Sequence, residues 1–93
     1  MDLTRDTVLI RAGDVTTTPV DDDLVMMRLM SNAFYGLDKV GRQIWEQLAE
    51  PTTIGALCAR LVTQYKVTAE ECEADLIVFM QDMVDEGLVN VQG

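Results

Sequence analysis

The segment from Thr68 to Gly87 constrains the fold of this chain more than any other. Its apolar residues recur at helical spacing, which predicts a long amphipathic helix. Thr68 and Glu71 match a capping box, in which each side chain bonds the exposed amide of the other residue, and Gly87 is a typical helix stop. The fold must therefore cover one side of this helix. At about 100° of turn per residue, the core side consists of Cys72, Leu76, Phe79, Met80 and Met83.

Three short strands are predicted before the helices. Residues 15–20 are rich in β-branched side chains, and in residues 24–30 and 33–37 the apolar side chains alternate between two faces. Pro19 suits an edge strand or a strand end, and Ser31 and Asn32 suit a hairpin turn. A three-stranded antiparallel meander is the simplest arrangement of these segments.

Two further helices are expected between the meander and the last helix. Asp38 can cap a helix that runs to about residue 49. Glu50, Pro51 and Thr52 end that helix and cap the next one, which covers about residues 53–65. The sequence does not decide the secondary structure of the two terminal segments. Thr7–Arg11 is either a short strand or a lead-in, and residues 88–91 are either a tail or a short strand. We expect one domain over residues 1–93, divided into a lead-in (1–14), a sheet (15–37), three helices (38–87) and a tail (88–93).

The charge of the chain argues against nucleic acid as a partner. There are 16 acidic and 7 basic residues, which gives a formal net charge of -9. The last helix has the position of the recognition helix in a helix-turn-helix protein, yet it has no Lys or Arg and carries several acids. Because DNA binding depends on cations that neutralise phosphates, the pattern favours capture of a peptide. The acids of this helix are Glu70, Glu71, Glu73, Asp75, Asp82, Asp85 and Glu86.

Few residues of this chain could support catalysis or bind a metal. Histidine is absent, so no Ser-His-Asp or Cys-His arrangement is available. Cys58 and Cys72 do not form a Cys-x-x-Cys pattern, and we expect both to be buried free thiols of a cytoplasmic protein. The three acids Asp21–Asp23 could form a carboxylate site, but a solvated bend explains them better. No signal peptide, membrane span, enzyme activity, metal or cofactor is expected.

The third predicted strand is a candidate binding edge. Nothing in residues 33–37 protects an unpaired strand edge, and Gly36 leaves room for another backbone. Ile77, Met80 and Val84 extend the apolar surface of the last helix and could form the opposite wall of a cleft. Two alternatives stay open: these residues belong to a broad core face, or a loop or the N-terminal residues cover the edge.

Ordered motifs along most of the chain resemble the PqqD family. They are Tyr35-Gly36-Leu37-Asp38, the spacing of Gly41 with Ile44 and Trp45, and the pattern from Asp75 to Leu88. The resemblance covers roughly residues 15–91. The family consists of small proteins or fused domains, called RiPP recognition elements, which recognise the leader segments of ribosomally made, post-translationally modified peptides. Among them, the chain is most similar to stand-alone forms that accompany a leader peptidase in lasso-peptide clusters.

The resemblance implies a fold and a mode of binding. The fold would be α+β, a winged helix-turn-helix with a three-stranded antiparallel sheet followed by a three-helix bundle. The chain would catalyse no reaction, would bind a precursor leader as an added strand, and would serve a leader peptidase or another modifying enzyme. Arg28, Asn32 and Ala33 depart from the usual family pattern, which bears on leader selectivity. The peptide-binding residues would be Ala33, Phe34, Tyr35, Gly36, Leu37, Ala74, Ile77, Met80, Gln81 and Val84.

Two other functions remain as alternatives. The helix order fits a winged-helix transcription regulator, although the acidic last helix opposes this interpretation. An exposed strand edge could instead pair with a second copy, as in an oligomerisation module. Asp75, Asp82 and Asp85 either recognise a basic leader residue, contact the enzyme, or are simply solvated.

Overall fold

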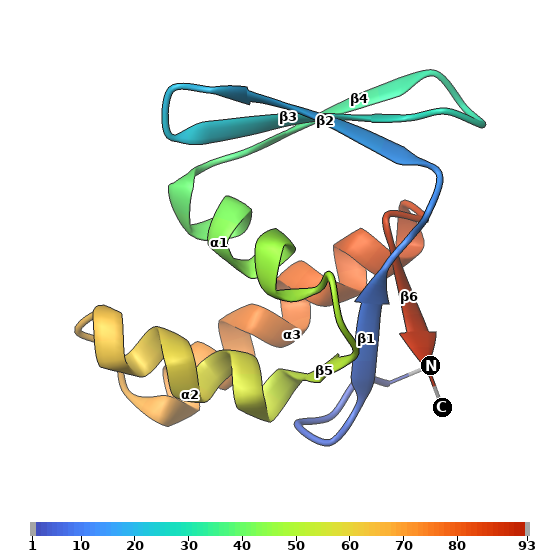
Figure 1. The fold of residues 1–93 in the computed structure, drawn as a ribbon. Helices are drawn as coiled ribbons and strands as arrows, with labels where there is room; N and C mark the ends of the chain where they lie inside the picture. The colour runs from blue at the N-terminus through green and yellow to red at the C-terminus, as the bar shows by residue number, and fades with distance from the viewer. Residues whose placement is uncertain (1, 93) are drawn as a thin grey trace.

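The computed structural model describes residues 2–92, which form three helices and two three-stranded antiparallel sheets (Figure 1). This α+β architecture agrees with the predicted fold class. No helix in the described part of the chain is long and apolar enough to cross a membrane. The elements are, in chain order, β1 (Val8–Arg11), β2 (Val15–Val20), β3 (Asp23–Arg28), β4 (Ala33–Leu37), α1 (Lys39–Gln47), β5 (Thr52–Thr53), α2 (Ile54–Gln64), α3 (Ala69–Asp85) and β6 (Val89–Gln92).

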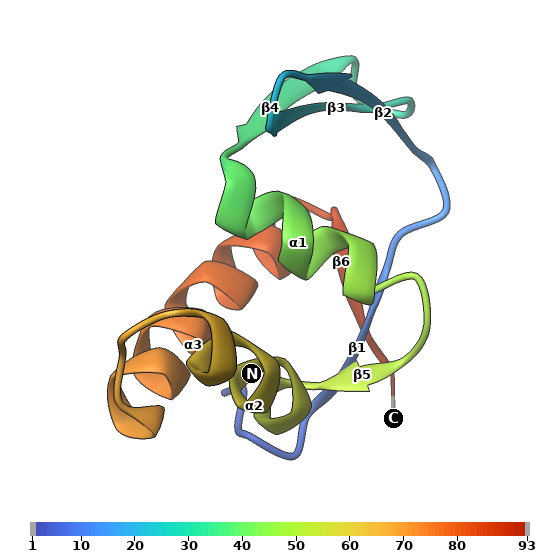
Figure 2. The same ribbon diagram turned by 60° about the vertical axis from the view of Figure 1, so that its left-hand side comes forward.

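The hairpin sheet, formed by β2, β3 and β4, confirms the predicted meander. It lies above the helices, with α1 directly beneath it (Figure 2). Leu24 and Met26 of the central strand β3 turn toward the helices and are buried, whereas Val25 between them is exposed. Asp21 and Asn32 each adopt a φ of 54° at the two turns, a left-handed conformation that Asp and Asn accept more readily than most residues. The residues at the two turns and the alternation of buried and exposed side chains therefore support the same three-stranded arrangement.

The terminal sheet, formed by β5, β1 and β6, joins the two ends of the chain. β1 is its central strand, and Leu9 of β1 lies opposite Val91 of β6. Leu9 and Val89 are buried, so both chain ends contribute to the core. The two terminal segments, whose secondary structure the sequence left undecided, are therefore both strands. The structure also contains β5, a strand of two residues, which is too short to be predicted from a periodic pattern.

Each helix begins at a side-chain cap. Asp38, Thr53 and Thr68 all accept a hydrogen bond from the backbone N–H three residues further along. Two of these caps were predicted, but the cap expected at Thr52 is one residue too early. Thr52 belongs to β5 instead, and its hydroxyl donates to backbone carbonyls between α1 and β5.

The end of α3 is a glycine-dependent turn. Gly87 has a φ of 76°, its N–H bonds the carbonyl of Val84, and the N–H of Leu88 bonds the carbonyl of Met83. These two bonds form a Schellman motif, which satisfies the last carbonyls of the helix. The turn directs the chain back along the helices into β6.

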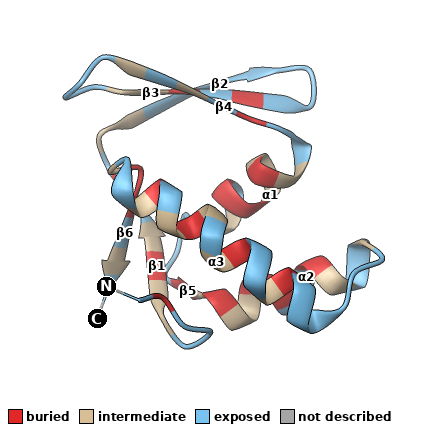
Figure 3. Ribbon diagram, turned by 180° about the vertical axis from the view of Figure 1, so that it is seen from behind, coloured by how far each residue is buried: buried red, intermediate tan, exposed pale blue. Residues whose placement is uncertain are grey.

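One hydrophobic core connects both sheets and all three helices. Leu9, Met26, Leu57, Met80 and Leu88 come from five parts of the chain, and each has its side chain fully buried. Figure 3 shows the buried positions on the inner sides of the helices and strands. The predicted core face of α3 is confirmed for Cys72, Leu76, Met80 and Met83, whereas Phe79 is half-buried.

The two cysteines are free and buried, as expected. Burial raises the pKa of the Cys58 thiol to about 12, and the neighbouring Cys72 thiol adds to this effect. The thiols lie in contact between α2 and α3, a proximity that the sequence did not predict. Because the thiolate is the reactive form, Cys58 is inert near neutral pH.

A small polar cluster ties the hairpin sheet to the C-terminal end of α3. The Tyr35 hydroxyl donates to Glu86 Oε2 at 2.9 Å, and Arg28 donates to the Glu86 backbone carbonyl at 3.4 Å. The Arg28 guanidinium also forms an ion pair with Asp14 at 3.5 Å. The hydrogen bond to the Glu86 carboxylate raises the pKa of Tyr35. Such exposed bonds contribute little stability individually, but together they hold β3 and β4 at a set distance from the helix end.

We predict that Gly87→Ala destabilises the protein by about 1–3 kcal/mol, because a side chain at this φ is strained. The added Cβ would also lie 2.6 Å from the Arg28 guanidinium. Urea unfolding followed by circular dichroism measures the change. Gly13→Ala is the control, because a Cβ there would meet no atom within 4 Å and the φ of Gly13 is not positive. Equal stability of both variants would show that the turn at Gly87 is relaxed in solution.

We also predict that Tyr35 titrates above the ordinary tyrosine pKa of about 10. Because its folded-state pKa is raised, the stabilisation from the bond to Glu86 is fully present below the unfolded-state pKa and is lost as the pH rises through the folded-state pKa. An ultraviolet absorbance titration in a Tyr65→Phe background isolates Tyr35, since the chain has 2 tyrosines. Glu86→Gln should lower the midpoint, whereas Glu46→Gln should leave it unchanged. An unchanged midpoint in Glu86→Gln would contradict the bond.

Candidate peptide-binding groove

The outer edge of β4 is unpaired. β4 pairs with β3 on one side only and forms the last strand of the hairpin sheet. Within residues 2–92, no backbone hydrogen bond outside the hairpin sheet reaches residues 33–37. The N-terminal residues do not cover this edge, since β1 lies between β5 and β6 in the terminal sheet. Alternate N–H and C=O groups along β4 are therefore available to another extended chain.

The residues of β4 point to two opposite faces. Tyr35 and Leu37 face the helices, and Ala33 is on the same side, because they lie opposite the inward residues of β3. Phe34 and Gly36 face away from the helices, and Phe34 is 70% exposed. Because side chains alternate along a strand, the Phe34 ring points outward, and the role of Phe34 in peptide binding stays a prediction.

The side of α3 that faces β4 is an acidic stripe, which we define as Asp75, Phe79, Asp82 and Glu86. At 3.6 residues per turn these four residues fall within roughly 60° of one another. Glu86 contacts Tyr35 of β4, and Asp75 lines a cavity shared with α1, so the stripe turns toward both elements. Phe79 is half-buried and the three acids are exposed.

The predicted helix residues lie outside this stripe. Ile77 and Val84 are half-buried on the same side of α3 as Glu73, which faces Arg5 and α2. By helical geometry that side is about 180° from Glu86. Ile77 and Val84 therefore lie on a different side of α3 from Glu86, and their role in a cleft wall stays a prediction. Of the other predicted residues, Met80 is fully buried, Ala74 is exposed, and Gln81 donates to Asp85 on the helix surface.

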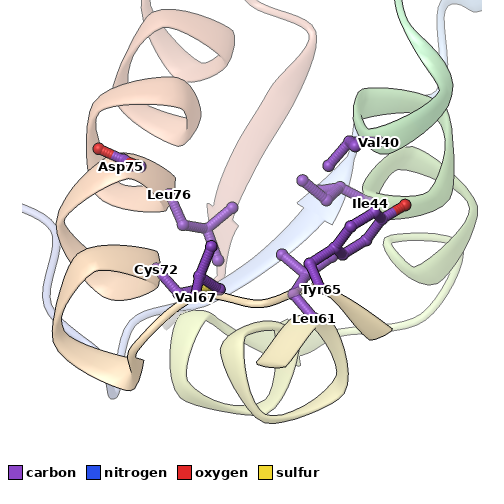
Figure 4. A pocket seen from close by; sticks show the side chains of 8 residues that line it. All are labelled: Val40, Ile44, Leu61, Tyr65, Val67, Cys72, Asp75 and Leu76. Atoms are coloured by element: carbon purple, nitrogen blue, oxygen red, sulfur yellow. The ribbon is translucent and has the colours of Figure 1, made fainter. Parts of the chain in front are cut away.

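An apolar cavity of about 300 Å³ lies between the three helices. α1 begins two residues after β4, and its Val40 and Ile44 face Leu76 of α3 across the cavity (Figure 4). The Tyr65 hydroxyl at its margin is held by a hydrogen bond to Gln43 at 3.1 Å. This volume is at the lower end of the range of ligand pockets, about 300–1,000 Å³. The full lining is Val40, Ile44, Leu61, Tyr65, Val67, Cys72, Asp75 and Leu76.

The sequence did not predict this cavity, because three helices and a loop contribute to it. Most of the lining residues belong to apolar stripes that predicted only core packing. The one feature of the sequence that could have indicated the cavity was Asp75, because it is a charged residue next to core positions of the helix. The acids Asp21–Asp23 are exposed in the turn between β2 and β3 and at the first residue of β3, in agreement with their interpretation as a solvated bend. No group of metal-ligating side chains occurs within residues 2–92.

Known proteins match the fold and the sequence of this chain. The structure of TbiB1 in complex with the TbiA(beta) leader peptide is 26% identical to this chain, with a TM-score of 0.80; the match covers 90% of this chain and 95% of TbiB1. A lasso peptide synthetase B1 complexed with the leader peptide is 15% identical, with a TM-score of 0.79; the match covers 88% of this chain and 96% of that protein. No curated protein sequence matches. The sequence pattern of the family described as coenzyme PQQ synthesis protein D matches residues 23–89, so this chain belongs to the PqqD family.

Proposed function

We propose that this chain binds the leader segment of a ribosomally synthesised precursor peptide as a strand added beside β4. The main observation that supports this proposal is the free edge of β4, which lies near an acidic face of α3 and an apolar cavity. An extended peptide at this edge would bond the unpaired N–H and C=O groups of β4. The leader peptide bound to the similar TbiB1 supports the same class of ligand for this chain.

The groove would divide the side chains of the leader into two sets. Backbone pairing with β4 would set the register, and every second side chain would then face Tyr35 and Phe79. Beyond the end of β4, an aliphatic side chain could enter the cavity of about 300 Å³. Full burial of such a side chain contributes about 1.5–3 kcal/mol. Apolar anchors would therefore supply most of the affinity, and the backbone would supply orientation.

The acidic stripe would favour leaders with a basic residue. Its three carboxylates stand on the helix wall that an added strand would face, and the net charge of -9 attracts cations at longer range. A Lys or Arg in the leader that points toward α3 would find an opposite charge there. A leader with an acid at that position would be repelled.

We further propose that the chain is a single-domain carrier that catalyses no reaction and needs no cofactor. It would be a winged helix-turn-helix whose wing, the hairpin sheet, has become a peptide-binding edge. It would hold the precursor for a cytoplasmic leader peptidase or another modifying enzyme. Tethering two reactants in this way raises their effective concentration to the order of mM when the linker is short.

The same charges weigh against the alternative functions. If the chain bound DNA, α3 would meet phosphates with Asp75 and Asp82, which are repulsive. A second copy could pair with the free edge of β4, but two chains of net charge -9 repel each other. Duplex binding that weakens with salt would support the first alternative, and a concentration-dependent dimer would support the second.

We predict that Phe79→Ala weakens leader binding roughly tenfold, whereas Ile77→Ala changes it by less than about twofold. Both residues are half-buried on α3, but only Phe79 lies on the stripe that faces β4. Fluorescence anisotropy of a labelled leader, taken from the precursor encoded beside this chain, measures the affinity. Thermal unfolding of both variants controls for loss of fold. Equal losses of affinity in equally stable variants would place the leader elsewhere.

We predict that Asp75→Asn with Asp82→Asn lowers the affinity for a leader that carries Lys or Arg, and flattens its dependence on salt, since two attractive charges are lost. Glu70→Gln with Asp85→Asn is the matched control, because it removes the same charge from exposed positions of α3 outside the stripe. The same anisotropy assay applies at low and high salt. Identical salt dependence in the two double variants would show that only the overall charge matters.

A further inference from the structure

The hairpin sheet presents an apolar outer face. We define the outer patch as Val25, Met27, Leu29, Met30 and Phe34. Met27 and Phe34 lie opposite each other in neighbouring strands, so their side chains share the face turned away from the helices. Val25 on β3 adjoins them, and the turn residues Leu29 and Met30 extend the apolar surface to the end of the sheet. In Figure 1 this face forms the top of the molecule, beyond all three helices.

The fold leaves all of these side chains except the half-buried Met27 exposed. Met30 is 81% exposed, Phe34 is 70% exposed and Leu29 is 52% exposed, although all three are large and apolar. Val78 of α3 is similarly exposed, but it is a single side chain, with Gln81 and Asp82 one turn further along the helix. A contiguous exposed apolar surface is costly in water, and in soluble proteins it commonly marks an interaction site.

The charges around the outer patch define its partner. Within residues 15–37 the one basic residue is Arg28, and it turns inward to Asp14 and Glu86. The turn between β2 and β3 and the first residue of β3 carry three exposed acids, Asp21–Asp23. A second copy would bring these like charges together, which opposes self-association. An apolar surface rimmed by Lys and Arg would complement the patch.

The outer patch is continuous with the peptide-binding edge. A strand added beside β4 extends the same sheet, so every second leader side chain would point outward beside Phe34. Gly36 also faces outward, and a Cβ added there would meet no atom within 4 Å, so the space beside it is open. The outer face would thus reach its full extent only when a leader is bound.

We propose that the outer patch is the docking surface for the processing enzyme, which contacts it together with the outward side chains of the bound leader. This inference rests on the proposed function, since the leader strand forms part of the surface. The enzyme contributes an apolar surface rimmed by basic residues to the contact. It consequently binds the complex of chain and leader more tightly than it binds the free chain.

The test measures two affinities separately. The leader affinity is followed by anisotropy, and the affinity of the processing enzyme encoded in the same gene cluster is followed by biolayer interferometry, with and without leader. The double variant Val25→Ser with Met30→Ser removes apolar side chains from the outer patch but touches neither the edge of β4 nor the cavity. Val78→Ser is the control, because it removes an exposed apolar side chain from α3, outside the outer patch.

We expect the double variant to bind the leader as the wild type does and to bind the enzyme roughly tenfold more weakly. The control should retain its affinity for the enzyme, and leader should strengthen enzyme binding to the wild type. Unchanged enzyme binding in the double variant, or no enzyme binding to the wild type with leader present, would overturn the docking proposal and leave leader binding intact. A dimer of the free chain that the double variant abolishes would also overturn it, by assigning the patch to a second copy. Failure of the wild type to bind any leader would instead overturn the proposed function.

Discussion

The pairing of β1 with β6 is the constraint on which the open groove depends. Four residue pairs, from Val8 with Gln92 to Arg11 with Val89, join the two ends of the chain in a sheet of their own. The backbone groups of both ends are thereby satisfied away from the hairpin sheet. Had the N-terminal segment paired beside β4 instead, the ladder would have been filled by the chain itself. The terminal sheet thus keeps the edge of β4 free and also contributes buried side chains such as Leu9 to the core.

Local chemistry explains which parts of the fold were predictable. The strands of the meander, the caps Asp38 and Thr68, and the stop at Gly87 each depend on residues close in sequence, and all are confirmed. β5 and the pairing of β1 with β6 depend on contacts between distant segments, and no local pattern encodes them. The outward direction of Phe34 follows from strand alternation alone, since it is the neighbour of the inward residue Tyr35.

The side of α3 that faces the groove could not be predicted from the sequence. The helix has a core stripe with half-buried apolar residues on both sides, Ile77 and Val84 on one and Phe79 on the other. Which flank meets β4 depends on where α2 and the terminal sheet pack, and Glu73, on the same side as Ile77, faces α2. Hydrophobicity alone favoured the Ile77 flank as the wall of the cleft, because this flank contains more aliphatic side chains. In the proposed binding mode, the acids of the opposite flank, which argued against DNA, also form the groove wall.

The charge distribution along α3 is consistent with a ligand that carries a positive charge. Glu70 and Glu71 in the first turn interact favourably with the positive end of the helix dipole. Asp82 and Glu86 stand near the negative end, where acids are unfavourable and where the last turn of the helix has no basic residue. Arg28 from the hairpin sheet supplies the missing cation by donating to the Glu86 carbonyl. The Glu86 carboxylate also accepts a hydrogen bond from Tyr35, whereas the structure gives no hydrogen bond or ion pair for the Asp82 carboxylate within residues 2–92. A cationic ligand would therefore explain Asp82 better than the needs of the fold do.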